Sequence, residues 1–143
     1  MIIPRTLSLI LAALFVLVSA GVAETSPYSR IRSAGQFAIG GVGITGVTSQ
    51  GELAMRMIRD SPLGEERLRR LLGESSPAGQ MYALFALRQL NPPDYSALAE
   101  PFRRRSTSVP TISGCFVYTQ RMSEAVRWID RWAKKMRATE KKT

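Results

Sequence analysis

The stretch SSPAGQMYALFALRQLNPP, residues 75–93, decides the fold that we expect for this chain. Ser76 and Pro77 stand in the order of a helix N-cap followed by proline at the first helical position, and Asn91 with the two prolines after it stops the helix. Between these signals, apolar residues occupy nearly every side of the helix instead of one stripe. A helix that is apolar all round is buried, so we predict a central core helix over 77–90.

Similar punctuation surrounds this helix on both sides. Ser49-Gln-Gly-Glu52 has the spacing of a capping box, in which the Ser49 side chain accepts the N3 amide and Glu52 reaches back to the cap. Ser61-Pro62 predicts a second helix that ends at Gly73, and a fourth begins after Asn91 and is kinked or shortened by Pro101. These helix starts lie 12 to 15 residues apart, which predicts two solenoid-like helical hairpins.

The remaining segments complete a mainly α prediction with about five helices. Residues 121–137 carry apolar side chains at helical spacing, typical of a C-terminal amphipathic helix. Residues 33–51 carry no charge and six glycines, and residues 106–118 are rich in β-branched side chains. We therefore predict a short extended or β element near 36–45 and another near 108–118, and pairing between the two is a weaker expectation. The side chains expected to pack the first against the core are Phe37, Ile39, Val42, Ile44 and Val47.

The glycines at 41, 43 and 46 spell G-x-G-x-x-G, the fingerprint of dinucleotide-binding turns. That fingerprint requires a strand before it, a helix that opens within it and a parallel strand afterwards. Here the capping box places the helix start at Ser49, after the last glycine, and no parallel strand is expected to follow. We therefore predict that the chain binds no nicotinamide dinucleotide.

The N-terminus predicts export. Arg5, the apolar run TLSLILAALFVLV over 6–18 and the small residues after it form the three regions of a signal peptide. Cleavage is expected after Ala23, with Ala20 as the alternative and an uncleaved anchor as the rival interpretation. The predicted organisation is a signal peptide over 1–23, a glycine-rich lead-in over 24–48 whose first residues are flexible, a helical domain over 49–137 and a polar tail over 138–143. The product is periplasmic or extracellular.

Composition argues against several kinds of chemistry. The chain has no histidine and one cysteine, Cys115, so histidine-based catalysis and an internal disulfide framework are impossible, and a zinc site is not expected. Its 11 carboxylates are scattered beside basic residues, without a pair in an apolar setting. We therefore expect no enzymatic activity, cofactor or metal. Cys115 is expected to be buried, and an intermolecular disulfide or a reactive thiol is the alternative.

The formal charge of +9 predicts affinity for polyanions, with plain solubility as the competing explanation. Two clusters are the candidate contacts for an anionic envelope surface. Trp128 and Trp132 are the candidate contacts for a protein partner, although their helical spacing favours packing on the core. The candidate polyanion contacts are Arg103, Arg104, Arg105, Lys134, Lys135, Lys141 and Lys142.

Two resemblances point in the same direction. The stretch over 29–58 (SRIRSAGQFAIGGVGITGVTSQGELAMRMI), SSPAGQMYALFALRQL and the SGC at 113–115 resemble small exported bacterial proteins of unassigned function. AGQMYALFALRQLNPPDY is similar to HEAT-type helical repeats. The resemblances imply a helical scaffold of the kind that binds other proteins, with no catalytic residues. We expect an exported scaffold or protein-binding domain, or alternatively a basic protein that binds an anionic surface.

Overall fold

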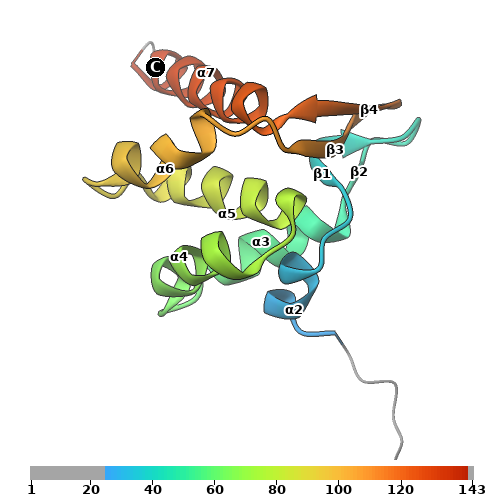
Figure 1. The fold of residues 1–143 in the computed structure, drawn as a ribbon. Helices are drawn as coiled ribbons and strands as arrows, with labels where there is room; N and C mark the ends of the chain where they lie inside the picture. The colour runs from blue at the N-terminus through green and yellow to red at the C-terminus, as the bar shows by residue number, and fades with distance from the viewer. Residues whose placement is uncertain (1–24, 142–143) are drawn as a thin grey trace, which may run out of the picture.

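The computed structural model describes residues 25–141, and the predicted signal peptide and Lys142 lie outside them. The described part is 59% helical and contains six helices and a four-stranded mixed sheet, so it is an α+β fold and the mainly α prediction is wrong (Figure 1). No helix within residues 25–141 is long and apolar enough to cross a membrane. The elements in chain order are α2 (Pro27–Arg32), β1 (Phe37–Val42), β2 (Val47–Thr48), α3 (Gln50–Arg59), α4 (Gly64–Glu74), α5 (Pro77–Leu90), α6 (Tyr95–Arg103), β3 (Ser108–Gly114), β4 (Phe116–Arg121) and α7 (Met122–Glu140).

The two charge-poor stretches of the sequence meet in the sheet. The strand order is β2-β1-β3-β4, with β1 and β3 parallel and the two outer pairs antiparallel. Phe37 lies opposite Thr111 and Ala38 opposite Ile112, which confirms the weaker expectation that these stretches pair. The expected β elements are therefore present, but a parallel pair requires a long crossover, and all of α3 to α6 form it.

The glycine motif forms the turn of the β1–β2 hairpin. Gly43 and Gly46 have φ values of 71° and 64°, in the left-handed region that favours glycine. The parallel strand that we did not expect exists as β3, but it follows only after four helices. Ile44 is 97% exposed and Val47 is 59% exposed, so the prediction that both pack on the core is wrong. Ile44 lies in the turn and Val47 begins β2, and both side chains face solvent.

The predicted core helix is confirmed as α5, with the bounds Pro77–Leu90. The Ser76 side chain accepts the Gly79 N–H, and Asn91 ends the helix in the left-handed conformation. Seven consecutive residues from Met81 to Leu87 are buried. Because α5 packs against α3, α4, α7 and the sheet, and touches α6 least, the two predicted hairpins are not the organising units.

Other helix limits differ from the prediction for local reasons. Pro62 lies in a turn, and α4 begins at Gly64, where a Cβ atom would meet the Ile58 carbonyl oxygen at 2.4 Å. Gly73 lies inside α4, and Pro101 lies inside α6 without ending it. The expected flexible lead-in contains α2, whose Ile31 is fully buried, and α7 continues to Glu140.

Candidate binding surfaces

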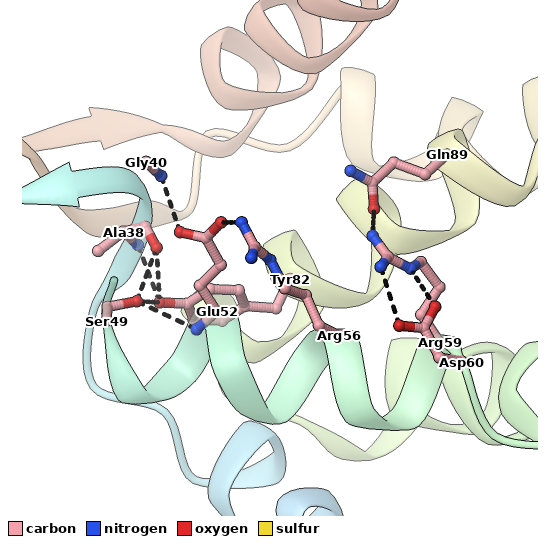
Figure 2. Close-up of polar contacts among 9 residues, drawn as sticks. All are labelled: Ala38, Gly40, Ser49, Glu52, Arg56, Arg59, Asp60, Tyr82 and Gln89. Carbon is pink, nitrogen blue, oxygen red and sulfur yellow. Dashed lines mark hydrogen bonds and ion pairs between the residues drawn. The ribbon is translucent and has the colours of Figure 1, made fainter. Parts of the chain in front are cut away.

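Along the part of β1 that does not pair with β2, side chains from the helices and their N-caps cover the strand edge (Figure 2). β2 pairs only with Gly41 and Val42, which leaves the backbone groups of Ala38 and Gly40 without a strand partner on that side. The Ala38 N–H donates to the Tyr82 hydroxyl at 3.0 Å, and the Ala38 carbonyl accepts from both the Tyr82 and Ser49 hydroxyls. The Gly40 N–H donates to Glu52 at 2.8 Å. These side chains take the place of a neighbouring strand.

Glu52 is buried, 2% exposed, and its hydrogen bonds are all to groups of the fold. Its N–H donates to the Ser49 side chain, as the capping box predicts. Its carboxylate does not return to the cap but accepts from Gly40 and, at 2.5 Å, from Arg56 one turn later in α3. The carboxylate therefore joins α3 to the edge of β1.

An open depression of about 760 Å³ lies over this network. It is lined by Gly51, Ser49 and Tyr82 among others, and a Cβ atom at Gly51 would lie 2.4 Å from the Tyr82 hydroxyl oxygen. Burial raises the pKa of the Tyr82 hydroxyl, which therefore remains protonated near neutral pH. Both hydroxyls are already committed to Ala38, so neither is a free acid, base or nucleophile.

The opposite edge of the sheet has no such cover within the described part of the chain. β4 pairs with β3 and is the outermost strand on its side. Phe116, Val117 and Tyr118 are 78%, 69% and 43% exposed. Ser113 and Phe116 close a two-residue turn, and the alternation of antiparallel pairs then directs the backbone groups of Val117 and Thr119 away from β3. We call residues 116–121 the open edge.

Cys115 lies in the turn that precedes the open edge, and it is exposed. The expectation that it is buried is therefore wrong. The sequence carries a signal for this turn, because Gly-Cys between two β-rich runs is a two-residue hairpin connection with glycine first.

The first predicted basic cluster is largely neutralised by neighbouring carboxylates. Arg103 donates to Asp130 of α7 at 3.1 Å, and Arg104 pairs with Glu100 at 2.8 Å. Asp130 also lies 3.7 Å from Arg88, so it links α5, α6 and α7. Arg105 lies over the Phe102 ring, 4.5 Å from its centroid. The residues of this cluster therefore contribute to helix packing as well as to charge.

The charge without ion-pair partners is concentrated on α7. Six exposed cations there have no carboxylate within 4.0 Å among residues 25–141. Most follow the spacing of one helical face, opposite the buried Ala125, Ile129 and Ala133. Only Lys134, Lys135 and Lys141 belong to the predicted set; a charge pattern at helical spacing was the missed signal for the others. The six cations, which we call the basic face, are Arg127, Arg131, Lys134, Lys135, Arg137 and Lys141.

The two tryptophans pack against the core. Trp128 lies 6.0 Å from Phe37 and 5.9 Å from Phe85 between ring centroids, and Trp132 lies 4.6 Å from Phe85. Both are partly buried, and Trp132 also borders a depression of about 420 Å³ with Met136 and Arg137. Their main contacts are with the core, so the surface that they offer to a partner is small.

Within residues 25–141, no group of three or more histidine, cysteine, aspartate or glutamate side chains is arranged to hold a metal ion. Comparison with protein-family models, curated proteins and solved structures finds no match. The two resemblances described for the sequence therefore stay predictions.

Proposed function

We propose that this chain is an exported, non-enzymatic protein-binding domain and that the open edge of β4 is its binding surface. One observation carries the proposal: the sheet has one edge closed by side chains and one edge that presents exposed apolar residues. An exposed strand edge offers a row of hydrogen-bonding groups to an extended segment of another chain. Phe116 and Tyr118 add aromatic surface, and aromatic residues are enriched in binding hot spots.

The distribution of charge along the chain supports a protein partner at the open edge. Residues 106–120 contain no charged side chain, whereas the described charges lie on the helices, their connections and Arg121. Binding at the open edge is therefore expected to depend on apolar contact and backbone pairing, and to persist at moderate salt.

Mutation of Val117 tests the proposal. Immobilised mature protein, residues 24–143, is exposed to an envelope extract at low and moderate salt, beside the Val117→Lys variant. A lysine places a charge on the edge strand, which disfavours pairing with another chain, so the amount of bound protein recovered should fall by at least tenfold. The same fall is expected whether the bound protein is another species or an untagged copy of this chain. Ser96→Lys on the exposed side of α6 is the control. Equal recovery by wild type and Val117→Lys would contradict the proposal.

The basic face of α7 favours a second function, binding to an anionic bilayer surface. Five of its six cations line none of the depressions described above, and they extend from residue 127 in α7 to its C-cap at residue 141, about 21 Å along the helix axis. A row of cations of this length outside a depression suits an extended surface more than a small ligand. Attraction of lysine and arginine to anionic lipid is about 1 kcal/mol per residue near the surface.

Vesicle flotation tests whether the basic face binds anionic lipid or whether its charge serves only to keep the protein in solution. Wild-type protein should bind vesicles that contain phosphatidylglycerol but not neutral phosphatidylcholine vesicles, and added salt should release it. Lys134→Gln with Lys135→Gln should weaken binding about 30-fold, from about 2 kcal/mol. Arg32→Gln with Arg67→Gln is the control matched in charge, because both residues are exposed and belong to α2 and α4, on the far side of α5 from α7 (Figure 1). An equal loss for this control would point to net charge and exclude a specific face.

A further inference from the structure

We infer that the partner of the open edge is a second copy of this chain, joined by antiparallel pairing of β4 with β4. This inference depends on the proposed function, because it names the occupant of the same surface. An antiparallel strand edge is complementary to itself across a two-fold axis, in hydrogen-bonding pattern as well as in apolar content. The pairing would extend the sheet from four strands to eight across two copies.

Charge favours a second copy at this surface. Two molecules with a formal charge of +9 repel each other wherever their basic helices approach. Residues 116–120 are uncharged, so β4 allows two copies to meet with their cations apart. An acidic partner would instead be drawn to the basic face of α7, since cations there lack carboxylate partners within the described residues.

The outward backbone groups select one register. Val117 and Thr119 both direct their N–H and C=O groups away from β3, so each pairs with the other across the axis. The axis then passes beside Tyr118, which lies opposite its own copy. In this register, the two Arg121 residues are about 20 Å apart along the strands, more than two Debye lengths at physiological salt.

The same register excludes the native cysteine from the contact. Cys115 would lie opposite Arg121 of the second copy, so two Cys115 residues are also about 20 Å apart. A disulfide requires Cα atoms within about 7 Å. The inferred dimer is therefore independent of oxidation, which distinguishes it from a dimer made by the exposed Cys115 thiol.

The dimer is expected to be weak. With about 200 Å² for an aromatic side chain, the exposed fractions of Phe116, Val117 and Tyr118 give roughly 350 Å² of apolar surface per copy. A standard interface contributes about 800 Å² per partner. We expect a Kd on the order of 10–100 µM, with backbone pairing adding to the side-chain contact.

Cysteine scanning on a Cys115→Ser background tests pairing and register together. Single cysteines at Val117, Tyr118 and Thr119 are oxidised at about 100 µM protein, within the expected range of Kd. Tyr118→Cys should cross-link most, because directly opposite positions outside the hydrogen-bonded pairs have Cα atoms about 4.5 Å apart, whereas Val117→Cys and Thr119→Cys place theirs about 7–8 Å apart. Ser96→Cys on α6 gives the background rate of collision. A yield at all three positions no greater than that background would overturn the inference.

Sedimentation of the unmodified chain completes the test. Wild type and Cys115→Ser should show the same concentration-dependent dimer with or without reductant, and Val117→Lys should weaken it by at least tenfold. A dimer that disappears with reductant would overturn the inference in favour of Cys115. If the chain stays monomeric and no cross-link forms while Val117→Lys still abolishes capture of a different protein, the inference fails and the proposed function stands.

Discussion

The two edges of the sheet differ in how their backbone groups are satisfied. At β1, hydroxyl and carboxylate groups of Tyr82, Ser49 and Glu52 occupy the positions that a further strand would fill. At β4, the outward groups of Val117 and Thr119 face solvent beside exposed aromatic rings. Strand position alone therefore does not make an edge available: α3 and α5 contact β1, whereas β4 contacts α7, the helix that continues directly from it (Figure 1).

The largest expected effect separates the buried and exposed aromatic residues. Phe85 is 2% exposed and contacts Phe37, Trp128 and Trp132, so Phe85→Ala should lower the free energy of unfolding by about 3–5 kcal/mol. Phe116→Ala makes the same chemical change at the open edge and should cost no more than about 0.5 kcal/mol. Urea unfolding of dilute protein measures both. Similar losses for the two variants would show that Phe116 belongs to a packed core.

Removal of one hydroxyl should weaken the closed edge. Tyr82→Phe leaves the buried Ala38 N–H without its acceptor, which is expected to cost about 1–3 kcal/mol. Tyr118→Phe removes a hydroxyl from a residue that is 43% exposed and should change the free energy of unfolding by less than about 0.5 kcal/mol. Equal stabilities of Tyr82→Phe and wild type in urea would mean that Tyr82 does not close the β1 edge.

A charge on β4 should prevent strand pairing at the open edge without changing the fold. Because the Val117 side chain is 69% exposed, Val117→Lys should shift the free energy of unfolding by less than about 0.5 kcal/mol in dilute solution. It should nevertheless weaken self-association by at least tenfold in sedimentation. If Val117→Lys unfolds the protein, β4 is part of the core and the contrast between the two edges is lost.

The smallest expected effect is the loss of stability at low pH that comes from the ion pair of Asp94 with Arg69. Hydrogen bonds from Arg69 lower the pKa of Asp94, which links α4 to the start of α6. A lowered folded pKa adds stability above the unfolded value of about 3.9, and this contribution is lost as pH falls through the folded pKa. Wild type should therefore lose slightly more stability than Asp94→Asn between pH 5 and pH 2, an interval of about three units around that value. A loss of equal size in both proteins would contradict the linkage.

Local signals predicted the helices better than the sheet. Ser76, Pro77 and Asn91 fix α5 because caps act within one turn, and the capping contact from Ser49 was predictable for the same reason. The parallel pairing of Phe37 with Thr111 joins residues more than 70 positions apart, and no local pattern specifies it. The ion pair of Arg103 with Asp130 joins residues 27 positions apart, so the run of three arginines does not by itself indicate that one of them is paired.

The apolar residues at the hairpin tips show that a hydrophobic pattern does not by itself predict burial. The sequence predicts that Ile44 packs on the core and that Phe116 lies in an extended or β segment, and only the second prediction is confirmed. Both side chains are exposed at the tips of the two hairpins, where the Gly43 N–H donates to the Gly114 carbonyl at 2.9 Å between the two turns. Hydrophobicity indicates which side chains gain from burial, but the topology decides which of them are within reach of the core.

Hydrogen exchange of individual backbone amides tests most directly whether one edge is closed and the other open. We expect slow exchange at Ala38 and Gly40 at every protein concentration, since side chains hold both N–H groups. At Val117 and Thr119 we expect fast exchange in dilute protein and protection that rises with concentration as β4 pairs with a second copy. Equally slow exchange at Val117, Thr119 and Ala38 in the most dilute sample would contradict an open edge at β4.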